Sequence, residues 1–310
     1  MNKYVDYLMH PTKLILALSA HGLLPILSDR KYIELMFKYR MGYTLNLNNP
    51  VTYNEKLQWL KLFDHDPLHS LLCDKFEAKK YISNLIGDEY IVPTLGVWDS
   101  FDKIDFDALP NQFVLKCTHD SSGLVICKDK KTLDIPLARK KINHSLAMDY
   151  FLISREWPYK NIKPRIIAEK FLGDNIHDYK FFCFNGVPKF MYIATNEGLK
   201  KTSTVKSGKS KVELQIDYYD MNFNHLPFIR VYPNATCKLE KPKSFEKMQE
   251  IARKLSSGMI HVRVDLYNID GKIYFGEMTF FTGSGFSAFT PQKWDYIFGD
   301  CIKLPIANNC

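Results

Sequence analysis

Residues 261–291, HVRVDLYNIDGKIYFGEMTFFTGSGFSAFTP, contain the pattern that decides the fold. Apolar and polar residues alternate on both sides of the segment NIDG at 268–271. Alternation with a period of two is typical of strands, and a short turn that ends in Gly commonly joins two antiparallel strands. The sequence therefore predicts a β-hairpin centred on residues 268–271.

Charged side chains of the two predicted strands fall on common faces. Successive side chains of a strand point to opposite faces, so Arg263 and Asp265 share one face. On the return strand Glu277 and Thr279 share a face, and Tyr274 is expected on the other. In a matching register, which the turn sequence does not fix, Asp265 and Glu277 lie opposite or diagonal to each other, beside Arg263. Such a set suits Mg²⁺ bound to a polyphosphate. Solvated charges on an ordinary hairpin are the alternative.

Length and composition are those of a soluble globular protein. The chain has 310 residues, enough for a sizeable core and two or three subdomains. Forty-two Lys and Arg against 34 Asp and Glu give a net charge of +8, which favours anionic ligands such as nucleotides, acidic sugars or phospholipid headgroups. Nucleic acid is not an expected partner, because the sequence has no long basic tail and its aromatic residues do not interleave with a basic stripe.

Cysteine usage and hydropathy predict a cytoplasmic protein. The seven cysteines are odd in number and form no C-x-x-C pair, as is typical of reduced thiols. No apolar run reaches the roughly 18 residues of a transmembrane helix, and residues 1–13 do not resemble a signal peptide. Residues 14–27 are the most apolar. We expect a core or interface helix there, with contact to the inner face of the membrane or to a biosynthetic complex as the alternative.

Helical patterns dominate the first part of the chain. Residues 1–70 are predicted to be largely helical, and TYNE at 52–55 matches a capping box that opens an amphipathic segment. Residues 74–87, DKFEAKKYISNLIG, form another predicted helix with an acidic start and a glycine end. Lys75, in its first turn, is either a phosphate contact or a solvated charge. A further helical stretch is predicted over 136–157.

A loop of small residues lies between two predicted strands. The strands cover 113–116 and 124–127, and HDSSG at 119–123 connects them. Such a loop can fold over a triphosphate, because its backbone N–H groups and hydroxyls are not hindered by bulky side chains. Lys116, at the base of the loop, can offer a point charge to phosphate oxygens. An ordinary hairpin turn is the alternative.

The remaining patterns alternate between strands, one loop and one helix. Residues 165–171 predict a buried strand, and residues 178–195 a hairpin that turns at Asn185-Gly186. Residues 196–211 are polar and rich in Lys, Ser and Gly, as in a loop that is either a lid or a solvated connection. Residues 244–258 form an amphipathic helix leading into the hairpin at 261–291.

Five short blocks are spread widely along the chain. They are DK at 74–75, FVLK at 113–116 with its loop, AEK at 168–170 with DYK at 178–180, RVD at 263–265, and GEMT at 276–279. In this order they resemble the TupA-like family of ATP-grasp proteins, which is associated with teichuronopeptide and other cell-surface polysaccharide synthesis. The resemblance covers roughly residues 30 to 300.

The resemblance implies an α+β chain with the ATP-grasp fold. In that fold two lobes with antiparallel sheets enclose Mg-ATP, and here a helical N-terminal region precedes them. The expected division is 1–70 for the helical region, 71–167 for the N-terminal lobe with the phosphate loop, and 168–310 for the C-terminal lobe with the metal site.

The resemblance also implies a role for each candidate site residue. Lys116 with His119, Ser121, Ser122 and Gly123 positions the triphosphate. The backbone of Glu169, Lys170, Phe171 and Leu172 contacts adenine, and Asp178 binds ribose. Lys180 contacts phosphate or substrate, Arg263 stabilises the charge of the transferring phosphoryl group, and Asp265, Glu277 and Thr279 are the Mg²⁺ ligands. Most of the superfamily has Asn where this sequence has Thr279, so the chain departs from the pattern at that ligand.

The implied activity is an ATP-dependent ligation. A carboxylate, on a sugar or an amino acid, is phosphorylated to an acyl phosphate, and an amine or related nucleophile then displaces phosphate. Two alternatives remain open. One is a glycosyltransferase that uses a nucleotide sugar, with the D-x-D triplet at 105–107 as its metal motif. The other is a nucleotide- or polysaccharide-binding scaffold with weak or no catalysis.

Overall fold

The computed structural model describes residues 11–20, 27–174, 176–195, 214–235 and 239–305. The chain divides into two compact units. Unit 1 contains Met1–Pro50, Glu55–Gly173 and Gly283–Phe286, and unit 2 contains Val51–Asn54, Asp174–Thr282 and Ser287–Cys310. The predicted division into 1–70, 71–167 and 168–310 stays a prediction, and its second boundary lies within strand β4 of unit 1. The predicted loop at 196–211 lies outside the described residues.

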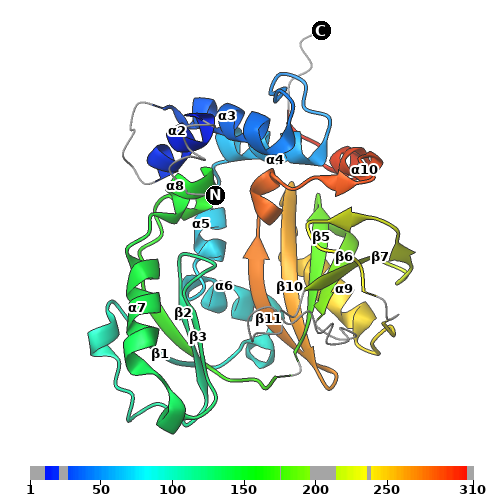
Figure 1. The fold of residues 1–310 in the computed structure, drawn as a ribbon. Helices are drawn as coiled ribbons and strands as arrows, with labels where there is room; N and C mark the ends of the chain where they lie inside the picture. Colours follow the sequence, from blue (N-terminus) through cyan, green and yellow to red (C-terminus); the bar gives the residue numbers. More distant parts are fainter. Residues whose placement is uncertain (1–10, 21–26, 175, 196–213, 236–238, 306–310) are drawn as a thin grey trace, which may run out of the picture. The chain divides into compact units, whose positions relative to one another are not determined.

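Unit 1 combines helices with a four-stranded antiparallel sheet of order β1-β4-β2-β3 (Figure 1). The strands are β1 (Thr94–Trp98), β2 (Phe113–Cys117), β3 (Leu124–Cys127) and β4 (Ile166–Lys170). The helices are α2 (Pro11–Ala20), α3 (Asp29–Met41), α5 (Pro67–Cys73), α6 (Glu77–Ile86), α7 (Ile135–Leu146) and α8 (Tyr150–Ser154); α4 (Tyr53–Phe63) begins in residues assigned to unit 2 and continues in unit 1. The strands predicted at 113–116, 124–127 and 165–171 are confirmed.

The helix predicted over 136–157 is interrupted. Helix α7 ends at Leu146 and α8 spans only Tyr150–Ser154; α8 ends there because Arg155 adopts a left-handed conformation with φ of 56°. That conformation stops a right-handed helix. The Arg155 side chain is buried, forms an ion pair with Asp29 and donates to Ser19 Oγ at 3.1 Å. The residue that ends α8 thus also connects α8 to α2 and α3.

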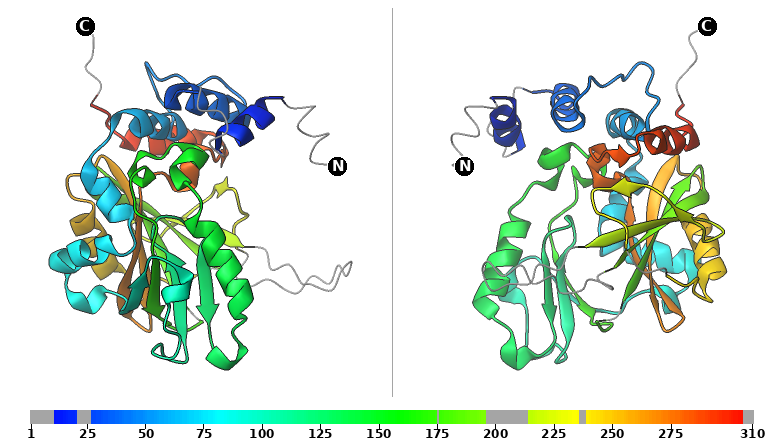
Figure 2. Two further views of the ribbon diagram at one scale, coloured as in Figure 1. Left: turned by 90° about the vertical axis from the view of Figure 1, so that its left-hand side faces the viewer. Right: turned by 45° about the vertical axis from the view of Figure 1, so that its right-hand side comes forward.

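Helix α7 covers one face of the unit 1 sheet (Figure 2). The side chains of β2 alternate, so that Phe113, Leu115 and Cys117 are buried while Val114 and Lys116 lie on the other face. Each fully buried aliphatic or aromatic side chain contributes about 1.5–3 kcal/mol to folding. The core thereby fixes which face presents Lys116.

A charged side chain is buried in the helical part of unit 1. Lys61 Nζ donates to the carbonyl oxygens of Ser154, at 2.9 Å, and Ser284, at 2.8 Å, and lies 4.2 Å from the ring centroid of Phe286. Burial lowers the pKa of Lys61 to about 7, although the nearby Glu156 carboxylate acts in the opposite direction. The ammonium is therefore held at a cost in solvation.

The titration of Lys61 should make the free energy of unfolding depend on pH. The folded protein releases the Lys61 proton near pH 7 and the unfolded chain near pH 10.5. Between these values the unfolded state binds more protons, so Lys61 makes the free energy of unfolding rise with pH, by up to about 1.4 kcal/mol per pH unit. We expect Lys61→Met to flatten this slope between pH 7 and 10 in urea unfolding. Lys31→Met, at an exposed site in α3, should retain it; equal slopes in both variants would contradict the assignment.

Unit 2 is built on a six-stranded antiparallel sheet of order β11-β10-β5-β6-β7-β8. Its strands are β5 (His177–Phe184), β6 (Val187–Thr195), β7 (Gln215–Asp220), β8 (His225–Leu226), β10 (His261–Ile269) and β11 (Lys272–Thr279); β9 (Ile229–Arg230) and β12 (Phe289–Thr290) form a separate pair. Its helices are α9 (Phe245–Leu255) and α10 (Lys293–Cys301). The two predicted hairpins, with turns at 185–186 and 270–271, are confirmed.

Helix α9 covers one face of the unit 2 sheet (Figure 2). Phe245 of α9 packs against Phe181 with ring centroids 5.9 Å apart, and Cys183 also points to α9. Lys180 and Phe182 alternate with these residues and so lie on the opposite face. That second face is charged around Lys180 and aromatic around Phe182, and the charged part contains the predicted metal residues.

None of the helices in the described parts of the chain is both long enough and apolar enough to cross a membrane. The apolar segment predicted at 14–27 is helical through Ala20, and residues 21–26 lie outside the described residues.

Candidate active site

A β-bulge sets the register of the β10–β11 hairpin. From the two-residue turn outward the pairing runs regularly to Leu266 opposite Phe275, and beyond the bulge Asp265 lies opposite Glu277. Gly276 is the extra residue. Without it, continued pairing from the turn would place Glu277 opposite Val264, on the face away from Asp265. The bulge therefore brings the two carboxylates to one face.

The bulge also corrects one sequence prediction. Tyr274 pairs with Tyr267 and so lies on the face that carries Asp265 and Glu277, whereas we predicted it on the other face. The prediction was wrong because strict alternation along the strand fails at Gly276. A Cβ atom at this glycine would lie 3.1 Å from the carbonyl oxygen of Asp265 and 3.1 Å from the Tyr267 ring, so the bulge leaves little room for a side chain.

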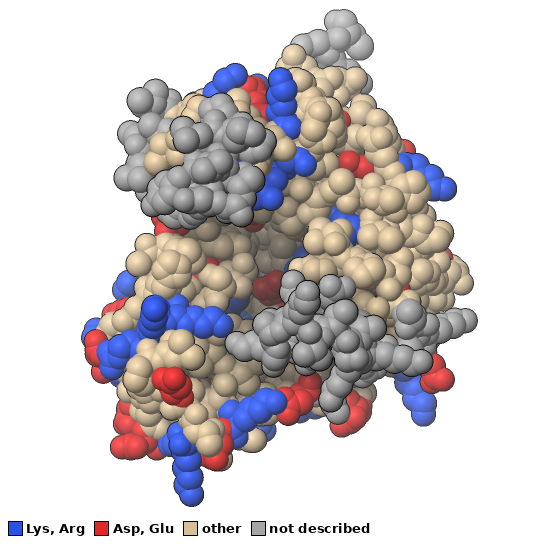
Figure 3. Space-filling view, viewed as in Figure 1, with Lys and Arg blue, Asp and Glu red and all other residues tan. Residues whose placement is uncertain are grey.

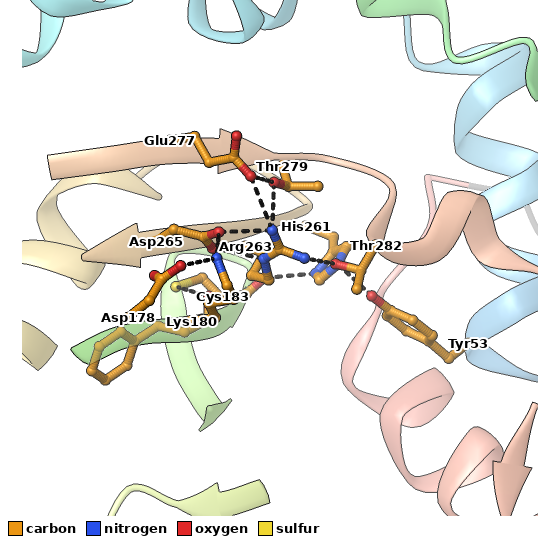
Figure 4. Close-up of polar contacts among 11 residues, drawn as sticks. Tyr53, Asp178, Lys180, Cys183, His261, Arg263, Asp265, Glu277, Thr279 and Thr282 are labelled. Carbon is orange, nitrogen blue, oxygen red and sulfur yellow. Dashed lines mark hydrogen bonds and ion pairs between the residues drawn. The ribbon is translucent and has the colours of Figure 1, made fainter. Parts of the chain in front are cut away.

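Arg263 lies between the two acids (Figure 4). Its Nε and Nη2 atoms donate to the two oxygens of Asp265 at 2.6 and 2.7 Å. Nη2 also donates to Glu277 Oε1 at 3.2 Å and to Thr279 Oγ1 at 2.9 Å. Burial opposes the charge of Arg263, but the Asp265 carboxylate raises the pKa of the guanidinium well above its usual value. The predicted convergence of Asp265, Glu277 and Arg263 is confirmed.

Strand β5 adds a lysine and an acid to this group. Lys180 Nζ donates to Asp265 and forms an ion pair with Asp178 Oδ2 at 2.6 Å. Figure 4 shows Asp178 and Lys180 directed toward Asp265 from the neighbouring strand. Desolvation raises the pKa of Asp178 to about 6, although Lys180 acts to lower it. Asp178 Oδ1 is buried and has no hydrogen-bond partner among the described residues. An acceptor that lacks a donor can take a hydroxyl group of a ligand.

The donor set suits a hard divalent cation. Asp265 and Glu277 offer carboxylate oxygens and Thr279 offers a hydroxyl, all on one face of the hairpin. These are hard oxygen donors, the ligand type that Mg²⁺ takes together with phosphate oxygens and water. Within the described ranges, no group of three or more His, Cys, Asp or Glu side chains is arranged to hold a metal ion by itself.

In unit 1 the sheet face opposite α7 is part apolar and part charged. Lys116 pairs across the strands with Leu124, and Val114 with Ile126. Leu124 is 39% exposed and Ile126 is 50% exposed, although both are aliphatic. Val114, Leu124 and Ile126 were not among the predicted site residues, although in β2 the alternation of Val114 with buried neighbours places it on the face opposite the core.

Two lysines hold the acid on β4. Glu169 accepts from Lys116 Nζ at 2.6 Å and from Lys79 Nζ at 2.5 Å, one lysine to each carboxylate oxygen. Burial opposes the charge of Glu169, but the two lysines hold the pKa of its carboxyl below the usual value. Lys79 belongs to the polar side of α6, but its side chain reaches β4 and is only 13% exposed.

The loop between β2 and β3 is organised by Asp120. The Asp120 carboxylate accepts from Ser122 Oγ at 2.6 Å, from the backbone N–H of Gly123 at 3.2 Å and from Ser145 Oγ. A Cβ atom at Gly123 would lie 2.5 Å from Cys117 Sγ, so glycine is needed there. Ser121 Oγ hydrogen-bonds Tyr150 at 2.6 Å, while His119 is buried with Nε2 3.3 Å from the Met148 carbonyl oxygen.

The predicted adenine segment continues from β4. Lys170 donates its backbone N–H to Pro93 at 3.0 Å, and Phe171 and Leu172 are half-buried. The candidate residues fall into two sets, each within one unit. Lys116, His119, Ser121, Ser122, Gly123, Glu169, Lys170, Phe171 and Leu172 belong to unit 1, and Asp178, Lys180, Arg263, Asp265, Glu277 and Thr279 belong to unit 2. Their roles stay predictions.

The net positive charge is not concentrated on the face drawn in Figure 3. There, Lys and Arg side chains are interspersed with Asp and Glu side chains and with larger uncharged areas.

Several solved structures resemble this chain at low identity. The D-alanine–D-alanine ligase of Helicobacter pylori is 16% identical with a TM-score of 0.38, over 75% of this chain and 62% of that chain. The D-alanine–D-alanine ligase of Bacillus anthracis complexed with ATP is 14% identical with a TM-score of 0.39, over 67% and 56%. The L-amino acid ligase of Bacillus licheniformis is 13% identical with a TM-score of 0.43, over 83% and 56%. The chain thus spans less than two thirds of the length of each. No curated protein matches it.

The evidence for a protein family covers most of the chain. The sheets of both units are antiparallel and accompany helices, as expected for an α+β ATP-grasp fold. The family model described as TupA-like ATPgrasp matches residues 55–303, which include both candidate sets of site residues. The protein belongs to the TupA-like ATP-grasp family.

Proposed function

We propose that the protein is an ATP-dependent ligase that activates a carboxylate as an acyl phosphate and joins it to an amine or a related nucleophile. The observation that carries the proposal is the cross-strand pair Asp265–Glu277 with Arg263 between the carboxylates. Positioned oxygen ligands and a guanidinium are what phosphoryl transfer requires, because most of its catalysis is positioning and charge stabilisation.

The unit 1 surface supports ATP as the phosphoryl donor. Val114, Leu124 and Ile126 form an aliphatic strip, exposed at Leu124 and Ile126 and half-buried at Val114, that suits the flat face of a base. Lys116 lies beside this strip and offers its ammonium to phosphate oxygens. In the neighbouring loop Ser122 donates its hydroxyl proton to Asp120, so Ser121 carries the hydroxyl better suited to a phosphate oxygen. On this proposal, adenine contacts the backbone of 169–172.

The unit 2 residues take the remaining roles. Asp265, Glu277 and Thr279 would hold Mg²⁺, which supplies charge neutralisation at the phosphates. Asp178, with its unpartnered buried oxygen, would accept a ribose hydroxyl. Lys180 and Arg263 would stabilise negative charge, first on the phosphoryl group and then on the tetrahedral intermediate.

The proposed reaction has two steps. A carboxylate oxygen attacks the γ-phosphorus, the bond from phosphorus to the bridging oxygen breaks, and ADP leaves. The amine then attacks the acyl carbon, the C–O bond to phosphate breaks, and the nitrogen loses a proton. Excluding water protects the acyl phosphate from hydrolysis. We place this reaction in the cytoplasm, in the synthesis or modification of cell-surface polysaccharide, with a carboxylate-bearing sugar or amino acid as substrate; family membership supports this assignment.

The glycosyltransferase alternative gains no support from its metal motif. Asp105 Oδ1 accepts from the backbone N–H of Asp107 at 3.0 Å and of Ala108 at 3.2 Å, so its carboxylate closes a local turn. Both aspartates of the triplet are exposed in that turn.

Ligand-dependent stability tests the proposal. We expect Mg-ATP at 100 times its dissociation constant to raise the free energy of unfolding by about 2.7 kcal/mol, because only the folded state binds it. UDP-sugars should have no effect in the same thermal-shift titration. Stabilisation by UDP-sugars without a response to ATP would overturn the proposal. Phosphate release in pools of carboxylates and amines then separates a ligase from a binding scaffold, which would bind ATP without turnover.

A further inference from the structure

The Lys79 side chain is only 13% exposed, so its ammonium is held by protein groups and is not a surface charge. Its Nζ atom lies 2.5 Å from Glu169 Oε1, 2.7 Å from the Val92 carbonyl oxygen and 3.1 Å from Thr94 Oγ1. An ammonium has three N–H donors, so these three acceptors use all of them. Lys79 is thus bound to protein groups and is not oriented as a direct phosphate ligand.

The same Glu169 carboxylate also binds Lys116. Its second oxygen, Oε2, accepts from Lys116 Nζ at 2.6 Å. The Glu169 side chain is 7% exposed, against 22% for Lys116, which lies on the sheet face beside Val114. A carboxylate fixed on one side by Lys79 can therefore hold the Lys116 side chain in one orientation at the edge of the aliphatic strip formed by Val114, Leu124 and Ile126.

The charge balance gives Lys79 a second effect. Glu169 with Lys116 alone would be a neutral pair, with little attraction for an anion. With Lys79 the group contains two cations and one anion, so it remains positive near Lys116. Burial lowers the pKa of Lys79, and its interaction with Glu169 opposes that shift.

We propose that Lys79 is a positioning residue for nucleotide phosphates: it neutralises Glu169, so that Glu169 orients Lys116 without cancelling its positive charge. The proposal rests on the proposed ATP-binding function and assigns Lys79 a role within that site. It predicts a loss of affinity that depends on the phosphates of the ligand.

The test compares Mg-ATP with adenosine by calorimetric binding to the full chain. We expect Lys79→Gln to weaken Mg-ATP binding about 10- to 100-fold, the range found for residues that orient the ligands of metal sites. Adenosine binding should change less than about twofold, since adenosine carries no charge for Lys116 to attract. Lys79→Arg keeps the charge and should recover most of the ATP affinity. Lys79→Met, of similar length, is measured beside Lys79→Gln so that the result does not depend on one variant folding.

Two controls separate positioning from general structural effects. Lys80→Gln removes the same charge from the adjacent, exposed position of α6 and should leave both affinities unchanged. In a Glu169→Gln background there is no carboxylate to neutralise, so adding Lys79→Gln should cost much less than it does in the native chain.

The outcomes distinguish this inference from the proposed function. If the native protein binds neither Mg-ATP nor adenosine, the ligase proposal falls and the role of Lys79 falls with it. If the native protein binds Mg-ATP and Lys79→Gln binds it equally well, only the role of Lys79 is overturned. The role of Lys79 is also overturned if Lys79→Gln weakens the binding of ATP and of adenosine equally, or if its effect on ATP affinity adds to that of Glu169→Gln. In either case Lys79 would only support the structure.

Discussion

Glu277→Gln is expected to lower ATP-dependent turnover by about 10²–10³-fold, the loss typical when one charge-stabilising group is removed from an active site. The substitution keeps the size of the side chain and one acceptor oxygen, but removes the negative charge that a divalent cation requires. The Glu277 side chain is 37% exposed, and its contact with Arg263 is 3.2 Å long. We therefore expect the free energy of unfolding to change by less than about 1 kcal/mol.

Phosphate release and urea unfolding measure the two halves of this prediction. Glu250→Gln is the matched control, since Glu250 is 62% exposed on α9 and pairs with Lys247. It should change neither quantity. If Glu277→Gln turned over at the native rate, Glu277 would not be a ligand of the proposed metal site. If the variant lost turnover and also unfolded, the loss would be explained by instability and not by a missing metal ligand.

Much of the fold follows from periodicity and turn chemistry in the sequence. Strands β2 and β3 were predictable because two short apolar runs flank a loop of small residues. The β5–β6 hairpin was predictable because Asn185 and Gly186 both adopt the positive φ that its tight turn requires. These signals are local, and local patterns largely decide where strands begin and end.

The facing of Asp265 and Glu277 depends on a feature that local patterns do not reveal. Counting outward from the Asp270–Gly271 turn pairs Glu277 with Val264, and the bulge at Gly276 shifts the pairing by one residue. A glycine inside a strand is compatible with a bulge but does not require one. The sequence could therefore predict which acids belong together, while their common face required the structure.

The Lys79–Glu169 contact could not be predicted from the sequence, for a different reason. Helical periodicity places Lys79 on the polar side of α6, and a polar side usually faces water. Here α6 instead directs Lys79 to β4, where Glu169 and the Val92 carbonyl oxygen accept from it. A periodic pattern distinguishes faces of a helix but does not identify the element that a charged face meets.

Asp265→Asn is expected to destabilise the protein by about 3–5 kcal/mol, the usual cost of removing one partner from a buried ion pair. The Asp265 side chain is 1% exposed and accepts from Arg263 at 2.6 and 2.7 Å as well as from Lys180. Asn keeps the shape but leaves two buried cations with one fewer anion. The two proposed carboxylate ligands of this hairpin should therefore differ in their effect on stability. Loss of the Glu277 charge should lower turnover alone, whereas loss of the Asp265 charge should lower both turnover and the free energy of unfolding.

Urea unfolding of single and double variants measures the effect of Asp265. If the loss arises from uncompensated charge, removing one cation should relieve it, so Asp265→Asn combined with Lys180→Met should be more stable than the sum of the two single effects predicts. An additive double variant would assign the loss to hydrogen bonding or packing. A loss below about 1 kcal/mol for Asp265→Asn would show that water or a rearranged Arg263 compensates the missing charge, because that value is typical of exposed pairs.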